Sequence, residues 1–245
     1  MNQAKPTVEG SPSGRRMAAA ERDLLLRIGA VSSILGVVTI FVADAFHGGH
    51  DPANLEAALS EYAANANWEV VHIGQFLGYA LVLGALVALY RSIGERRGAA
   101  LAQLGFVTAL VATATYAANQ AVDGVAIKFV ADEWVSAPAS EKANALRVAE
   151  AVRHVEIGLS SFSELILGSA LLLFGLAIAL GDLYPRLLGW AAMAVGAGWV
   201  ALGLLVARDG FTHLDLTMWV SVLLALWVLV LAVFLWRKAG KSNGP

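Results

Sequence analysis

Long apolar segments alternate with short polar segments along most of this chain. Six of the apolar segments match or exceed the roughly 20 residues that a helix needs to cross a hydrocarbon core about 30 Å thick. They cover residues 24–46, 70–90, 99–122, 156–180, 187–207 and 216–236. The pattern therefore predicts an all-α integral membrane bundle of six transmembrane helices.

The composition narrows both the class of protein and the chemistry open to it. Of the 245 residues, 58% are hydrophobic and only 15% are charged, which no ordinary soluble domain approaches. The chain contains no cysteine, so it cannot form a disulfide or a thiolate metal site. Any metal or catalytic site must use His, Asp, Glu, Tyr or Ser side chains. Nucleic-acid binding is not expected, because the basic residues cluster only at one rim of the predicted bundle.

The distribution of the basic residues predicts an orientation. Most of the 17 lysine and arginine residues lie near the two ends of the chain or in the connections 91–98 and 181–186. By the positive-inside bias, this side and both termini are cytoplasmic. Residues 1–23 and 237–245 are predicted as tails, the first of them disordered because it is polar and contains proline and glycine. The segments predicted to face outward are 47–69, 123–155 and 208–215.

The outward segment 47–69 is expected to contain a short helix on the membrane surface. Asp51 is a favourable cap, and Pro52 suits a first helical turn. Trp68 is expected to anchor the start of the second span at the membrane interface. Three apolar residues after the proline recur at helical spacing, namely Leu55, Leu59 and Tyr62.

The longest outward segment, 123–155, is predicted to be a helical hairpin that extends the third and fourth spans. Strong helix formers follow Pro138 without a breaker, so the hairpin should turn near Ala137 and Pro138. An extension of about 15 residues would rise roughly 22 Å above its own span. Between the fifth and sixth spans, Thr212 and Asp215 have the spacing of a capping box.

The histidines and the intramembrane polar residues gather in the outward half of the predicted bundle. Polar residues inside spans are energetically expensive, so their positions are informative. His72, Gln75 and Tyr79 share one helix face, and together with His154 they are candidate cofactor-binding residues. All five histidines lie at or just beyond the outward ends of apolar segments: His47, His50, His72, His154 and His213.

Neutral imidazoles and carboxylates are the ligands that zinc, copper or iron accept in a cysteine-free site. A haem held by two histidines from neighbouring helices is a further possibility. Glu164 is the best catalytic candidate, because it lies about 12 Å below the start of its span, too deep for easy access to water. The candidate metal ligands are His72, His154, His47, Asp44 and Asp123.

Several of these residues also have a structural interpretation. His47 and His50 flank two glycines at a helix exit and could be solvated loop residues, while His213 lies inside the predicted capping box. Asp123 and Lys128 could be solvated charges on a helix surface. Glu164 could instead have a structural role, in which its protonated carboxyl group forms a hydrogen bond between helices. Five tryptophans are expected mostly at the membrane belt or against lipid: Trp190, Trp199, Trp219, Trp227 and Trp236.

The layout resembles a group of bacterial six-span membrane proteins described as a domain of unknown function. The resemblance rests on a basic tail, on the sequence Asp-Pro-Ala-Asn-Leu at 51–55 and on Trp-Glu-Val-Val-His-Ile-Gly-Gln-Phe at 68–76. It covers most of the chain. It implies a location in the bacterial cytoplasmic membrane, and it implies no established activity or site residues.

Three functional classes follow from these patterns. The first is a membrane protein with an outward polar cavity that binds a metal, a haem or a quinone, in which His72, His154 and Glu164 should converge. The second is a non-enzymatic accessory subunit that binds a membrane or extracytoplasmic partner through the hairpin. The third is a small-solute transporter, which is disfavoured because the spans lack paired glycine or proline breaks.

Overall fold

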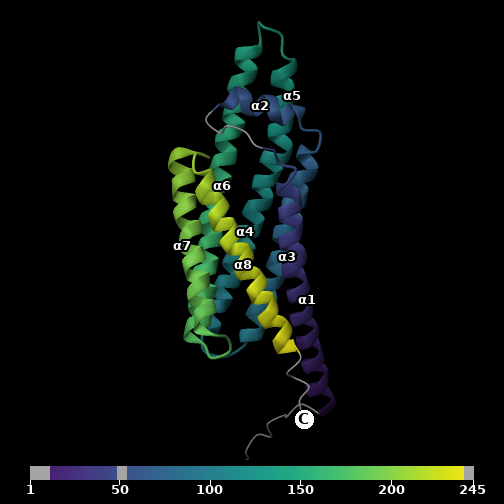
Figure 1. Ribbon diagram of the computed structural model, residues 1–245, viewed down its shortest axis with the longest axis vertical. Coiled ribbons are helices and arrows are strands. Elements are labelled where there is room, and N and C mark those ends of the chain that lie inside the picture. Colours follow the sequence, from purple (N-terminus) through teal and green to yellow (C-terminus); the bar gives the residue numbers. More distant parts are fainter. Residues whose placement is uncertain (1–11, 49–53, 240–245) are drawn as a thin grey trace, which may run out of the picture.

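The computed structural model describes residues 12–48 and 54–239, and within them it contains helices and short connections but no strand. The beginning of α1 and the end of α8 lie at the same end of the bundle, and a hairpin of α5 and α6 extends beyond the other end (Figure 1). The helices are α1 (Pro12–Asp44), α2 (Leu55–Ala64), α3 (Trp68–Ile93), α4 (Ala99–Ala121), the π-helix η1 (Val122–Ala126), α5 (Ile127–Ser136), α6 (Lys142–Leu180), α7 (Arg186–Asp209) and α8 (Leu214–Ala239).

Six helical stretches are long and apolar enough to cross a membrane, which confirms the predicted helical class and the number of spans. The third stretch is Ala99–Ser136, in which α4, η1 and α5 run continuously over 38 residues, and the fourth is α6 with 39 residues. At 1.5 Å per residue each is roughly 57 Å long, which far exceeds a hydrocarbon core of about 30 Å. By the length and composition of its helices, the chain is an integral membrane protein.

The predicted hairpin between the third and fourth spans is present. Its turn begins at Ala137, whose backbone is extended with φ −61° and ψ 138°, the conformation that a following proline favours. The Lys142 ammonium donates to the carbonyl oxygen of Val135 at 3.0 Å and also to that of Trp134. These bonds add partners to carbonyl groups in the last turn of α5, where a helix supplies few of its own.

The amino-terminal segment is more helical than the sequence predicts. Helix α1 begins at Pro12, so residues 12–23 are helical where the sequence predicts a disordered tail. The alanines at 18–20 are followed by Glu21 and Arg22, all of which favour helix strongly. Residues 1–11 and 240–245 lie outside the described part of the chain.

Glycines allow the helices of the bundle to approach closely. A Cβ atom added to Gly168 on α6 would lie 2.6 Å from the carbonyl oxygen of Gly196 on α7, and one added to Gly196 would lie 2.7 Å from the carbonyl oxygen of Gly168. Such backbone contact is a main source of helix association where lipid removes the hydrophobic driving force. These two glycines therefore serve the packing of α6 against α7.

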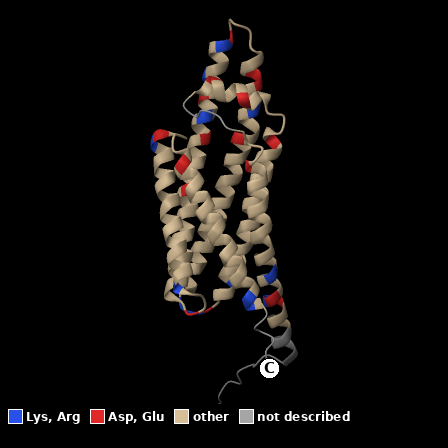
Figure 2. Ribbon diagram, in the orientation of Figure 1, with Lys and Arg blue, Asp and Glu red and all other residues tan. Residues whose placement is uncertain are grey.

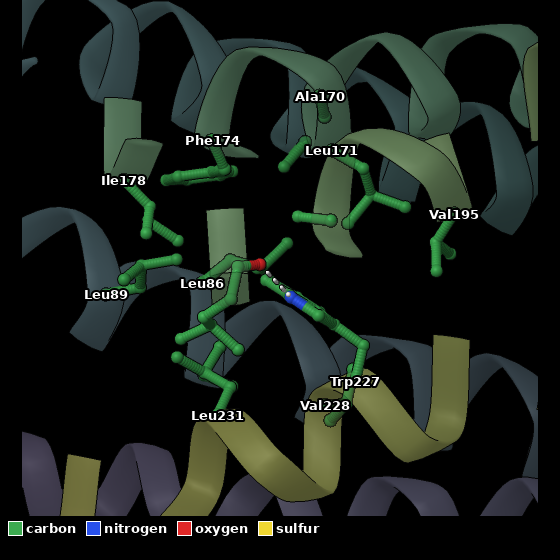
Figure 3. Packing of buried hydrophobic residues seen from close by; sticks show 14 of the residues in the cluster. Leu86, Leu89, Ala170, Leu171, Phe174, Ile178, Val195, Trp227, Val228 and Leu231 are labelled. Atoms are coloured by element: carbon green, nitrogen blue, oxygen red, sulfur yellow. Dashed lines mark hydrogen bonds between the residues drawn. The ribbon is translucent and has the colours of Figure 1, made fainter. Parts of the chain in front are cut away.

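The main apolar core lies between the membrane-spanning helices (Figure 3). Phe174 and Leu231 are fully buried in it, and the indole N–H of Trp227 donates to the carbonyl oxygen of Leu188 at 3.0 Å. Trp199 is also buried. These two tryptophans therefore depart from the expected belt or lipid-facing positions, whereas three others are exposed as expected: Trp190, Trp219 and Trp236.

A second apolar cluster joins α2 to the base of the hairpin, and α2 crosses the hairpin in Figure 1. Leu59 and Tyr62 of α2 are fully buried there against Ile127 and Trp134. Trp68 is also inside this cluster and only 1% exposed. Its predicted role as an interface anchor is therefore wrong, because α2 and the hairpin cover its ring.

The start of α2 also differs from the prediction. Asp51 and Pro52 lie outside the described residues, and the described helix begins at Leu55. Asn54 is its cap, since its Oδ1 accepts a hydrogen bond from the backbone N–H of Ala57 at 3.1 Å. Asparagine at this position satisfies a helix donor that has no partner within the helix.

Candidate metal centre

Three separate helical segments bring His47, His72 and Asp123 together. His47 follows the end of α1, His72 lies in the second turn of α3, and Asp123 belongs to η1. One ligand atom from each residue lies within 4.8 Å of the other two. These residues, from positions far apart in the sequence, form the candidate metal centre.

The hydrogen bonding of His72 defines which of its nitrogens faces the centre. Its Nδ1 lies 2.7 Å from the backbone carbonyl oxygen of Trp68. A carbonyl can only accept, so Nδ1 carries the hydrogen, and in the neutral form of the ring Nε2 presents its lone pair. That buried Nε2 has no hydrogen-bond partner among the described residues. Metal-binding histidines commonly have this arrangement, in which the second ring nitrogen donates to a carbonyl.

Asp123 lies opposite this nitrogen. Its Oδ2 is 3.2 Å from His72 Nε2, yet the pair does not have the alignment of a hydrogen bond. A lone pair and a carboxylate at this distance repel each other unless a cation or a proton lies between them. Two ligands of one tetrahedral zinc, each about 2.1 Å from the metal, are separated by roughly 3.4 Å. The observed separation is close to that value.

The π-helix η1 is the local structure that places Asp123. Gly124 packs directly against His72, and a Cβ atom added to Gly124 would overlap the Cβ and ring carbons of that histidine. The indole N–H of Trp68 donates to the backbone carbonyl oxygen of Asp123 at 2.8 Å. Single π-helical turns are frequent at functional sites. No feature of the sequence predicted this one, although Gly124 directly after Asp123 is a signal of close backbone approach.

His47 completes the group from the end of α1. Its ring lies 4.8 Å from the Trp68 ring and 5.2 Å from the His72 ring, measured between centroids. The amide of Asn65 donates to the backbone carbonyl oxygen of Phe46 at 3.2 Å and so ties this chain segment to the end of α2. Burial lowers the pKa of His47 below its ordinary value, which favours the neutral imidazole that binds metal.

A second layer of polar side chains lies below the three candidate ligands. Gln75 Nε2 donates to Asp44 Oδ1 at 2.7 Å, and Gln75 Oε1 accepts from Gln120 Nε2 at 2.7 Å. Gln120 Nε2 also lies 2.9 Å from the hydroxyl of Tyr116, whose ring stacks on that of Tyr79 at 4.0 Å. Asp44, Gln75 and Tyr79 thus belong to one polar network, which reaches the backbone of His72 through Gln120. Asp44 is not a member of the ligand group.

The other sequence candidates lie elsewhere. The candidate metal centre contains neither His154 nor Glu164. The prediction that these two residues converge with His72 is therefore wrong. His154 is exposed on α6. His213 lies just before α8, and its Nε2 is 3.2 Å from Asp209 Oδ2. His50 lies outside the described residues.

Glu164 is buried, with 8% of its surface exposed. Its Oε1 lies 3.4 Å from the hydroxyl of Ser160, and its Oε2 has no hydrogen-bond partner within the described part of the chain. The buried pair of Arg153 and Glu156, 2.9 Å apart between Nη1 and Oε1, was not predicted. Their i, i+3 spacing was the available signal.

Lys128 pairs with Asp132 and not with Asp123. Its ammonium lies 2.6 Å from Asp132 Oδ1 and 3.1 Å from the carbonyl oxygen of Ala63. The Asp123 carboxylate is therefore directed to the histidines instead of to a lysine. The interpretation of Asp123 as a solvated surface charge is wrong, because its side chain is only 18% exposed and its Oδ2 lies 3.2 Å from the buried Nε2 of His72.

The ligand set limits the kind of group that could bind. Two imidazoles and one carboxylate suit zinc, iron, copper or nickel rather than magnesium or calcium. The rings of His47 and His72 contact each other at 5.2 Å with an angle of 51° between their planes, which leaves no room for a porphyrin between them. The geometry therefore favours a bare ion over the haem considered from the sequence.

No protein-family model, curated protein or solved structure matches this chain. The fold and the site together define an integral membrane protein whose six candidate spans carry a histidine and aspartate group at the hairpin end of the bundle.

Proposed function

We propose that this chain is a metal-binding membrane protein in which His47, His72 and Asp123 hold one divalent first-row transition-metal ion. The observation that carries the proposal is the buried Nε2 of His72, which faces a carboxylate oxygen at 3.2 Å without a hydrogen bond. A divalent ion would satisfy both groups at once. It would also compensate the cost of burying a carboxylate beside two neutral rings.

The number of ligands suits a reactive site better than a purely structural one. Structural zinc sites are normally closed by four protein ligands, whereas catalytic zinc has three and keeps a position for water or substrate. The group described here supplies three. The layer of Asp44, Gln75 and Gln120 directly below it supports the helices that carry the ligands.

The charge distribution supports an outward location for this centre. Lysine and arginine mark the end of the bundle opposite the hairpin, and acidic residues predominate around the hairpin (Figure 2). By the positive-inside bias, the proposed arrangement has both termini in the cytoplasm and the metal centre on the outer face of a bacterial cytoplasmic membrane. Metal would then be acquired from the extracytoplasmic side.

Competition with a chromophoric zinc chelator tests the metal proposal. The full chain, purified in detergent and stripped with a chelator, should take up about one zinc ion per chain, as a tight site of this class does. His72→Ala should abolish that uptake. His213→Ala is the matched control, since this histidine also lies near an aspartate but outside the group.

Thermal unfolding and gel filtration of the metal-free proteins would show that His72→Ala remains folded. If His72→Ala and the unmodified chain bind zinc equally, or if the stripped chain takes up none, the proposal is wrong. The second functional class predicts this negative result, because an accessory subunit needs no metal.

A further inference from the structure

Polar side chains of α3, α4 and α6 continue from the candidate metal centre into the bundle at two successive levels. Each level takes one residue from each of the three helices. Spacings of three or four residues place the two members of a helix on the same face. These residues, called the polar column below, are Gln75, Gln120 and Ser160 at the upper level and Tyr79, Tyr116 and Glu164 at the lower level.

Contacts between the helices link the two levels. The Gln120 amide donates to Gln75 Oε1 at 2.7 Å and to the hydroxyl oxygen of Tyr116 at 2.9 Å. The rings of Tyr116 and Tyr79 stack with 4.0 Å between their centroids. Both tyrosine hydroxyls lie close enough to Glu164 for a charge on its carboxyl group to act on them. Polar groups therefore follow one another from Gln75 to Glu164.

The polar column is open at its upper end and closed at its lower end. At the upper end, the Gln75 amide donates to Oδ1 of Asp44, which is exposed at the end of α1. One turn below Glu164, the same faces of the three helices carry only apolar side chains, namely Leu83, Ala112 and Leu167. The column thus reaches Glu164 from the hairpin end of the bundle and does not cross it.

Glu164 is the deepest carboxyl group of α6 and lacks a full set of partners. It is 8% exposed. The Ser160 hydroxyl donates to its Oε1 at 3.4 Å, and its buried Oε2 has no hydrogen-bond partner among the described residues. That oxygen requires a donor, because burying an unpaired polar atom is costly.

No positive charge is placed to balance an ionised Glu164. Its titratable neighbours on α3 and α4 are Tyr79 and Tyr116, which are not cations. Arg153, three turns away on α6, is paired with Glu156. Helices α7 and α8 carry charged residues only at their ends. A buried carboxylate without a cation is strongly unfavourable, whereas a carboxyl group that holds a proton supplies the missing donor itself.

We propose that Glu164 is a proton-binding site inside the bundle, and that it exchanges its proton with water at Asp44 through the polar column. Because the Tyr116 oxygen accepts from Gln120, its own O–H proton can be donated to a Glu164 carboxylate, directly or through a water molecule. A proton from water at the open end then replaces it, so no charge remains on Tyr116. Buried carboxyl groups reached by polar side chains are typical of proton relays in membrane proteins.

This site is separate from the proposed metal function, because no residue of the polar column belongs to the candidate metal centre. Infrared spectroscopy of the full chain, stripped of metal, tests whether Glu164 holds a proton. At neutral pH the spectrum should contain the carbonyl band of a protonated carboxyl group, and Glu164→Gln should remove it. Glu150→Gln, at an exposed position of α6, is the control and should leave the band in place. An unchanged band in Glu164→Gln would overturn the proposal.

The rate of hydrogen–deuterium exchange at this band tests the path. Tyr116→Phe removes only a hydroxyl and should slow the exchange after transfer to D₂O by about tenfold or more. Thr115→Val is the matched control, because the Thr115 hydroxyl lies outside the polar column and donates to Val111 of its own helix at 3.0 Å. Thermal unfolding of both variants would show that they remain folded. Equal exchange rates in the two variants would show that the proton does not pass Tyr116, and would overturn the proposal.

Discussion

The imidazole Nε2 of His72 lies 3.2 Å from Oδ2 of Asp123, while the opposite ring nitrogen is held by the carbonyl oxygen of Trp68 at 2.7 Å. One contact orients the ring, and the other brings it to a carboxylate. Neither helix has the site by itself, because α3 supplies the imidazole and η1 supplies the carboxylate. This relationship underlies the first two predictions below.

Asp123→Asn should weaken zinc binding at least about 100-fold, because an amide oxygen carries no charge to balance the ion and is a weaker ligand for zinc. Asparagine has nearly the same shape, so the fold should be retained. Chelator competition measures the change. The matched control is Asp132→Asn, which removes a carboxylate paired with Lys128 on the hairpin and should leave the affinity unchanged. Equal losses in both variants would contradict the assignment of Asp123.

Gly124→Ala should destabilise the protein by about 1–3 kcal/mol, the usual cost of overpacking, and should weaken zinc binding as well. The added Cβ would overlap His72 and push η1 away from α3. Gly158→Ala is the control, since Gly158 is a helical glycine on α6 whose added Cβ meets no atom within 4 Å. Denaturation in detergent and zinc titration together measure both effects. A fully stable Gly124→Ala with normal zinc affinity would argue against close contact of η1 with His72.

Glu156→Gln should destabilise the protein by about 3 kcal/mol, because it leaves the buried Arg153 charge without its carboxylate partner. The double variant Arg153→Met, Glu156→Gln should regain part of the lost free energy of unfolding. Unfolding free energies of the two single variants and the double variant give the coupling between the residues. Additive losses would mean that the pair is not coupled in solution.

Tyr184 should resist ionisation at high pH. Burial raises its pKa to about 12, and its hydroxyl lies 2.6 Å from Ser92 Oγ. Above pH 10 the unfolded chain loses the phenolic proton while the folded chain retains it. The folded state therefore loses stability relative to the unfolded state as the pH rises from 10 toward 12.

The absorbance difference near 295 nm between the unmodified chain and Tyr184→Phe measures this titration. The difference should stay small until the pH approaches 12. A full phenolate signal from Tyr184 near its ordinary pKa of about 10 would show that the side chain is accessible to water.

The membrane-spanning helices could be predicted because their signal is local. A run of apolar residues long enough to cross a bilayer must satisfy its backbone hydrogen bonds within itself, so helix is the outcome whatever surrounds it. The hairpin was predictable for a similar reason, since Pro138 interrupts a region of strong helix formers. The position of Trp68 was not predictable, because the packing of α2 decides whether this tryptophan faces lipid or lies under α2.

The candidate site was only partly predictable. His47, His72 and Asp123 were all among the candidates, because polar groups at the ends of spans are few. His154 carried the same sequence signal as His72, yet it faces outward from α6. The rotation of each helix about its axis decides between these outcomes, and that rotation follows from contacts with neighbouring helices.

The sequence by itself determined the helical class, the six apolar spans and the end of the bundle where histidines and carboxylates gather, because each depends on local hydrophobicity and residue type. Only the tertiary structure decided which of those residues meet. The π-helical turn at η1, the close approach allowed by Gly124 and the cover provided by α2 bring Asp123 to His72 and His47. These are contacts between segments that are distant along the chain, and local sequence patterns do not specify them.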